Sequence, residues 1–120
     1  MLSGRHILIV EDEAAIALDL EDALRSLGAV VLGPVASVSD ALSLVKKDRA
    51  DCALLDINLG AERVDEVART LKDNSVPIIF VTGYSRKSVP RGFESSPLVR
   101  KPYDRKELFA LIASVFEAIS

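Results

Sequence analysis

The chain has 120 residues, a length that fits one domain because two domains of half this size would each lack a sufficient core. Hydrophobic residues make up 49% of the chain and charged residues 28%, proportions that exclude an intrinsically disordered protein. The formal net charge is -3, and the basic residues look scattered along the sequence. We therefore expect no direct contact with nucleic acid.

The cysteine content and the lack of long apolar runs indicate the cellular setting. Cys52 is the only cysteine and lies in an apolar run, so we expect a buried free thiol that suits a reducing cytoplasm. No apolar run approaches the ~20 residues needed to span a bilayer. The sequence predicts a cytoplasmic protein with no membrane contact.

Five short apolar runs predict the strands of a sheet. Their apolarity is continuous rather than alternating, which is typical of parallel strands covered on both faces by helices. The predicted strands are Ile7–Val10, Ala29–Leu32, Cys52–Leu55, Ile78–Val81 and Leu98–Val99.

Helical spacing fills the segments between most of these runs. The first predicted helix carries apolar residues at helical spacing and ends at Gly28, a natural C-terminal cap. Ser37 and Asp40 have the spacing of a capping box at the start of the second helix, and Asp104 and Glu107 have it at the start of the last. Apolar stripes mark the first, third and last helices at Ile16, Leu20, Leu24 and Leu27, at Val64, Val67, Ala68 and Leu71, and at Leu108, Leu111, Ile112, Val115 and Ile119.

The segment from Ser85 to Pro97 differs from the others. It contains two prolines, one glycine and little periodicity, so any helix there must be short or irregular. Strand and helix otherwise alternate along the chain, which predicts one doubly wound α/β domain over residues 1–120.

Polar residues follow the predicted strands directly. Glu11 and Asp12 follow the first strand, Asp56 the third, Thr82 the fourth and Lys101 the fifth. The carboxyl ends of parallel strands share one edge of the sheet, where ligands bind in open α/β folds. We therefore expect these side chains to form one site.

The residue types at this edge predict the chemistry of the site. Clustered carboxylates favour a hard divalent cation with oxygen ligands, of which Mg²⁺ is the best candidate. With the metal balancing charge, Asp56 can attack phosphorus and form an acyl phosphate. Lys101 and the hydroxyl of Thr82 are placed to hold phosphoryl oxygens.

Four motifs resemble the response-regulator receiver domain over essentially the whole chain. They are Ile-Leu-Ile-Val-Glu-Asp-Glu at 7–13, Leu-Leu-Asp-Ile-Asn-Leu at 54–59, Phe-Val-Thr-Gly-Tyr at 80–84 and Lys-Pro-Tyr at 101–103. The third motif looks like the receiver subfamily nicknamed FAT GUY, with Val81 in place of its alanine. The resemblance implies a CheY-like, flavodoxin-like sheet of strand order 2-1-3-4-5, and a stand-alone receiver without an output domain.

The resemblance also implies roles for the site residues. Asp56 would be the phosphoacceptor, Asp12 a direct Mg²⁺ ligand, Glu11 a ligand largely through water, and Asn58 a ligand through its backbone carbonyl. Lys101 and Thr82 would bind the phosphoryl group. The donor would be a histidine of a sensor kinase or phosphotransfer protein, and slow autodephosphorylation would reset a switch that is not an enzyme.

Two features concern the signalling output. Many receivers use an aromatic switch residue three positions before the lysine, but that position is Leu98 here, so Tyr84 is a candidate substitute. We expect phosphorylation to order the irregular segment before Leu98 rather than to rotate one ring. On the last helix, Phe109 and Phe116 either pack inside or form an interface for a downstream protein or a phosphorylation-dependent homodimer.

Two other functions remain as alternatives. A receiver-shaped binding module that is never phosphorylated would typically lack one of the site residues, and all are present. A haloacid-dehalogenase-like phosphatase places its nucleophile after the first strand, whereas Asp56 follows the third, and Asn58 stands where that group has a second aspartate.

Overall fold

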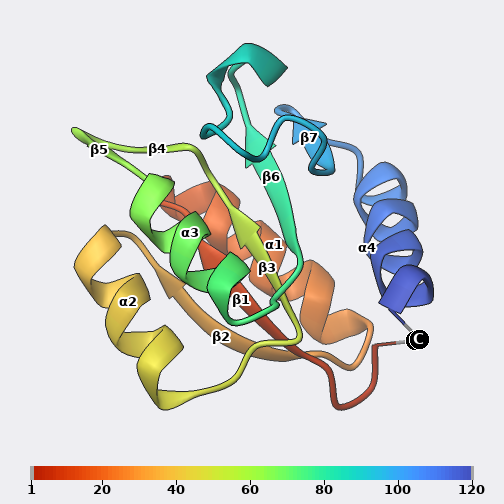
Figure 1. Ribbon diagram of the computed structural model, residues 1–120. Helices are drawn as coiled ribbons and strands as arrows, with labels where there is room; N and C mark the ends of the chain where they lie inside the picture. Colours follow the sequence, from red (N-terminus) through yellow and green to blue (C-terminus); the bar gives the residue numbers. More distant parts are fainter. Residues whose placement is uncertain (1, 120) are drawn as a thin grey trace.

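A five-stranded parallel sheet forms the centre of the molecule, with helices on both faces (Figure 1). The structure is a computed structural model that describes residues 2–119. The strands are β1 (His6–Val10), β2 (Val30–Val35), β3 (Cys52–Leu55), β6 (Ile78–Thr82) and β7 (Leu98–Arg100). Their order is β2-β1-β3-β6-β7, which confirms the predicted 2-1-3-4-5 arrangement of a flavodoxin-like fold.

Two pairs of helices cover the two faces of the sheet. The helices are α1 (Ala14–Ser26), α2 (Val38–Lys47), α3 (Asp65–Asp73) and α4 (Arg105–Ile119). Alternate residues of β1 point to opposite faces, so Ile7 and Ile9 pack with α1 and α4, whereas Leu8 and Val10 pack with α2 and α3. This double coverage explains why the strands are apolar without alternation. None of the described helices is long and apolar enough to cross a membrane.

The predicted helix ends are found where the sequence placed them. After α1, Gly28 has a φ of +90°, and the Ala29 N–H donates to the Leu24 carbonyl at 3.2 Å, the bond that closes a Schellman motif. The Ser37 hydroxyl accepts from the Asp40 N–H at 3.1 Å before α2. Before α4, the Asp104 carboxylate accepts from the Lys106 N–H at 2.8 Å.

A small hairpin in the connection between β3 and α3 was not predicted. It pairs β4 (Asn58–Leu59) with β5 (Glu62–Arg63) and turns through Gly60, whose φ is +64°. Strands of two residues are too short to produce an alternating pattern in the sequence. The hairpin is held on both sides, because the Glu62 carboxylate accepts from the Val38 N–H at 3.2 Å and Arg63 donates to the Ser88 carbonyl at 2.9 Å.

The segment between β6 and β7 is irregular, as expected. Its regular part is a 3₁₀ turn at Arg86–Ser88, because Pro90 and Pro97 prevent a continuous helix. Phe93 from this segment is 6% exposed and meets the Phe80 ring edge-on, with the ring centroids 5.9 Å apart. Arg86 donates to the carbonyls of Glu94 and Ser96 at 3.1 and 2.8 Å. The segment therefore covers this part of the sheet as an ordered loop with its own core residue.

Of the two phenylalanines on α4 for which packing inside and an interface were both open, one proves to be a core residue. Phe116 is 7% exposed in the cluster beneath α1 and α4, and the Arg5 guanidinium lies 4.6 Å from its ring centroid. The interface role of Phe116 is therefore wrong, because the ring fills space between α4 and the sheet. Phe109 is half-buried, and its interface role stays a prediction.

Replacing Phe93 with alanine tests whether the irregular segment is part of the core. We expect Phe93→Ala to lower the free energy of unfolding by about 3 kcal/mol, because the cavity forms against Phe80. Tyr84→Ala is the matched control, since Tyr84 is 54% exposed, and it should change stability by less than about 0.5 kcal/mol. Urea denaturation measures both, and equal effects would contradict the assignment.

Candidate functional site

Hydrogen bonds between neighbouring strands fix the backbone of the site. The Glu11 N–H donates to the Val35 carbonyl at 2.9 Å, and the Asp56 N–H donates to the Val10 carbonyl at 3.0 Å. The Lys101 N–H donates to the Thr82 carbonyl at 2.8 Å. The parallel ladder thus continues one residue beyond the strands. Each of these functional side chains leaves the sheet at a position fixed by its neighbour.

Three predicted carboxylates converge at this edge. Glu11 is 2% exposed and Asp56 5%, whereas Asp12 is open to solvent. One oxygen from each of the three lies within 4.8 Å of the others. Buried carboxylates so close together repel one another unless a cation balances them.

Lys101 supplies part of that balance. Its ammonium lies 2.7 Å from Glu11 Oε1, 3.0 Å from Asp56 Oδ2 and 3.0 Å from Glu13 Oε1. Glu13 was not predicted as a site residue, and the only sign of it in the sequence is the acidic run Glu-Asp-Glu at 11–13. The lysine is therefore held among three carboxylates that come from two strand ends.

Burial and charge shift two pKa values in the site. Burial raises the pKa of Glu11 to about 7, although hydrogen bonds from Lys101 and from the Glu13 N–H act in the opposite direction. For Lys101, burial lowers the pKa, but hydrogen bonds to Glu11, Asp56 and Glu13 outweigh burial and raise it above its usual value. Lys101 is thus a permanent cation, while Glu11 changes charge near neutral pH.

The residues at the site fit a divalent cation. Asp56 Oδ1 is buried and has no hydrogen-bond donor among the described residues, whereas the nearest donor to Glu11 Oε1 is the Lys101 ammonium at 2.7 Å. A buried carboxylate oxygen with no donor is costly, and a metal ion would remove that cost. Asn58 lies two residues after Asp56 at the start of β4, and its role as a carbonyl ligand stays a prediction.

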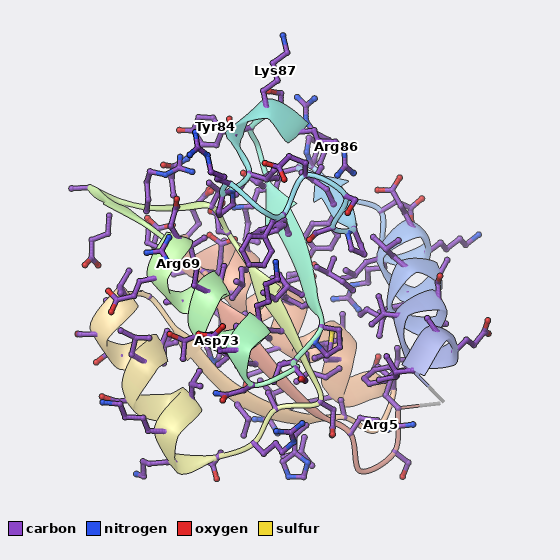
Figure 2. All side chains as sticks on the ribbon, viewed as in Figure 1. Arg5, Arg69, Asp73, Tyr84, Arg86 and Lys87 are labelled. Atoms are coloured by element: carbon purple, nitrogen blue, oxygen red, sulfur yellow. The ribbon has the colours of Figure 1, made fainter. Side chains whose placement is uncertain are left out.

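The three remaining predicted residues, Thr82, Tyr84 and Leu98, lie in β6, directly after it and in the neighbouring strand β7. Thr82 is fully buried, and its hydroxyl oxygen accepts from the Tyr84 N–H at 3.2 Å, which leaves the hydroxyl proton free to donate elsewhere. Tyr84 is exposed and points outward from the segment that follows β6 (Figure 2). Leu98 is half-buried against the core beneath α2 and α3, and it has no ring that could act as an aromatic switch.

A second polar network anchors the chain that carries Lys101. The Tyr103 hydroxyl donates to Asp19 on α1, and Arg105 lies 2.6 Å from Asp19 and 3.2 Å from Asp22. The Lys101–Pro102 peptide bond between the lysine and this anchor is cis. No feature of the sequence indicated this network, because its members are more than 80 residues apart.

The fold and site define a doubly wound α/β domain with a carboxylate-lysine centre at the strand ends, and comparisons with known proteins agree. The model of the response regulator receiver domain matches residues 7–113, so the chain belongs to that family.

Two relatives, one of them solved in two states, are similar to the chain. It is 35% identical to the phyllosphere-induced regulator PhyR of Methylorubrum extorquens over 113 residues, covering 90% of this chain and 42% of PhyR. The solution structure of SdrG from Sphingomonas melonis Fr1 has a TM-score of 0.84 and 38% identity, covering 97% of this chain and 99% of that one. The BeF3-activated conformation of SdrG has a TM-score of 0.78 with the same identity, covering 96% and 98%. The subfamily resemblance is consistent with these matches. The chain spans less than half the length of PhyR.

The raised pKa of Glu11 predicts that Mg²⁺ binding depends on pH. The proton on Glu11 competes with the metal, so we expect the affinity for Mg²⁺ to fall up to about tenfold per pH unit below about 7 and to level off above it. Isothermal titration calorimetry between pH 5.5 and 8.5 measures this. Glu11→Gln should weaken binding and flatten the profile, whereas Glu13→Gln should keep its shape. A flat profile for the wild type would contradict the prediction.

The anchor at Asp19 predicts a contribution of Tyr103 to stability. Tyr103→Phe removes the donor to Asp19 and keeps the ring, so we expect the free energy of unfolding to fall by about 1 kcal/mol. Tyr84→Phe is the matched control, because that side chain is exposed. Urea denaturation of both variants tests the difference, and a neutral Tyr103→Phe would show that the bond does not stabilise the fold.

Proposed function

We propose that this receiver domain accepts a phosphoryl group on Asp56 in a two-component phosphorelay, and that the modification changes its contacts with other proteins. The observation that carries the proposal is the environment of Asp56. Its carboxylate is 5% exposed, with Oδ2 bonded to Lys101 at 3.0 Å and Oδ1 lacking a donor beside Glu11 and Asp12. One oxygen thus contacts a fixed ammonium, and the other is buried without a donor in a residue grouped with the candidate metal ligands.

The arrangement suits phosphoryl transfer, which depends mainly on positioning and on stabilising charge. Asp56 Oδ2 attacks the phosphorus of a phosphohistidine, the P–N bond breaks, and the imidazole leaves with its electron pair. The Lys101 ammonium is already bonded to the attacking oxygen, so it lies within reach of the new phosphoryl oxygens. The hydroxyl of Thr82 donates to another of these oxygens.

Mg²⁺ is the proposed cofactor. Asp12, Glu11 and the unpartnered Oδ1 of Asp56 would hold it, with Asn58 contributing its backbone carbonyl. A bound Mg²⁺ neutralises charge on the phosphoryl oxygens and on the attacking carboxylate.

The proposed partners follow from this chemistry. The histidine that donates the phosphoryl group belongs to a sensor kinase or phosphotransfer protein in the cytoplasm, and a downstream protein reads the modified state. The solved BeF3-activated conformation of SdrG, 38% identical to this chain, supports an activated state in a close relative. Hydrolysis by the domain itself is slow and resets the switch, so the chain is a phosphoacceptor rather than an enzyme.

The response to phosphorylation is proposed to lie in the segment between β6 and β7. Leu98 has no ring to rotate, whereas the Thr82 hydroxyl is bonded directly to the backbone of Tyr84 at the start of this segment. Recruiting that hydroxyl to the phosphoryl group would change the bond to Tyr84 and rearrange the segment. A phosphorylation-dependent homodimer is one outcome of such a change.

Two alternatives are less well supported. A binding module that is never phosphorylated would not explain why Asp56 has a buried carboxylate oxygen without a hydrogen-bond donor. A phosphatase of the haloacid-dehalogenase type needs its nucleophile after the first strand, but Asp56 follows β3, the central strand of the sheet.

Intact-mass analysis tests the proposed function. After incubation with Mg²⁺ and acetyl phosphate, the wild type should gain one phosphoryl group, and Asp56→Asn should gain none. Chelation of Mg²⁺ should abolish the adduct, and Glu13→Gln should retain it because Glu13 is not a proposed metal ligand. If neither acetyl phosphate nor a histidine kinase modifies the wild type, the unphosphorylated binding module becomes the better explanation.

A further inference from the structure

The charges of this chain are strongly separated along its length. Residues 84–106 contain seven Lys or Arg and two Asp or Glu, which gives them a formal charge of +5. The rest of the chain contains eight basic and sixteen acidic residues, a formal charge of -8. The net charge of -3 hides this division, and the sequence-based view that the basic residues are scattered is wrong.

Five cationic side chains lie on or beside the segment between β6 and β7. Lys72 of α3 lies 5.2 Å from the ring centroid of Phe93. Arg100 pairs in register with Thr82 two residues after Leu98 pairs with Phe80, so it shares the sheet face on which Phe80 packs. Figure 2 shows Arg86 and Lys87 beside Tyr84, with Lys87 projecting away from the molecule. We call this surface the basic face; its members are Lys72, Arg86, Lys87, Arg91 and Arg100.

The basic face has one acidic neighbour in the described part of the chain, Glu94, which Arg91 and Lys72 attract electrostatically without a close ion pair. Arg25, Arg63 and Arg105 each form ion pairs with carboxylates, but no member of the basic face lies within 4.0 Å of a carboxylate there. The nearby acid is Glu94, and both of its carboxylate oxygens accept from the Gly92 N–H at 3.1 Å. Unpaired cations of one sign at a surface attract an acidic partner.

An open groove borders the basic face and adds an apolar component. Its volume is about 420 Å³, and its lining includes Lys72, Val76, Ile78 and Phe93. It lies along the start of β6, where the irregular loop stands instead of a helix. A groove of this kind accepts apolar side chains, whereas a nucleic-acid backbone offers only phosphate and sugar.

We propose that the basic face and this groove bind an acidic segment of a partner protein. Carboxylates of the segment pair with Lys87, Arg91 and Arg100, and an apolar side chain enters the groove beside Phe93. A polynucleotide fits less well, because the acidic centre formed by Glu11, Asp12 and their neighbours lies at the carboxyl ends of the strands, the end at which Arg100 pairs with Thr82, and repels an extended polyanion. The proposal does not depend on phosphorylation of Asp56.

The test is an NMR titration of the full, unmodified chain without metal. The probe is a synthetic peptide of ~20 residues with glutamate and leucine at helical spacing. We expect shift changes confined to α3, residues 83–100 and the groove, with affinity falling as salt rises. Lys87→Glu, Arg91→Glu and Arg100→Glu combined should weaken binding at least about tenfold. Arg86 is kept, because it holds the carbonyls of Glu94 and Ser96.

The matched control replaces Lys46, Lys47 and Arg49 with glutamate, so both triple variants have the same net charge. After correction for the general effect of that net charge on peptide attraction, the control should bind the peptide within about twofold of wild type. Equal loss in both variants would overturn the proposal by showing attraction that is not specific to the face. Tighter binding of a single DNA strand, self-association seen by light scattering, or no shift changes at millimolar peptide would overturn it as well. Because no phosphodonor or metal is present, failure here leaves the phosphoacceptor proposal unaffected.

Discussion

The contact between the Lys101 ammonium and the buried carboxylates of Glu11 and Asp56 is the interaction on which the site depends. Two carboxylates removed from water at one edge of the sheet would repel each other, and the lysine at 2.7 and 3.0 Å lowers that repulsion. The lysine reaches them because its own backbone continues the β6–β7 ladder and because Tyr103, two residues later, is tied to Asp19 on α1. The remaining oxygen of Asp56 has no hydrogen-bond donor among the described residues, so it is available to a further cation, as the proposed Mg²⁺ chemistry requires.

The irregular segment between β6 and β7 shows how a sheet face can be covered without a helix. Phe93 supplies apolar contact with Phe80, and Arg86 replaces helical hydrogen bonds by binding two carbonyls of the same loop. Such a loop has fewer internal constraints than a helix and begins at Thr82, a proposed ligand of the phosphoryl group. The loop therefore connects Thr82 in the site to exposed residues such as Tyr84 within a few residues of sequence.

The separation of charge gives the acidic centre and the segment between β6 and β7 different roles. The acidic centre lies at the strand ends and is suited to cations, whereas residues 84–106 carry a formal charge of +5. A partner that contacts the basic face would sit on the same loop that begins at Thr82. The proposed modification and the proposed docking surface are thus physically adjacent, although they are chemically opposite and independently testable.

By itself, the sequence determined the fold class, the strand order through the family resemblance, the helix caps and the site residues at the strand ends. It could do so because continuous apolar runs, capping residues and strand-end carboxylates are local patterns that can be recognised in the sequence alone. Only the tertiary structure decided that Phe116 is buried, that Glu13 joins Lys101, that Tyr103 binds Asp19, and that Lys72 of α3 lies against Phe93 of the loop. The reason is physical: these facts depend on which helix face meets the sheet and on contacts between residues far apart in sequence. No local pattern of apolar and polar residues encodes either.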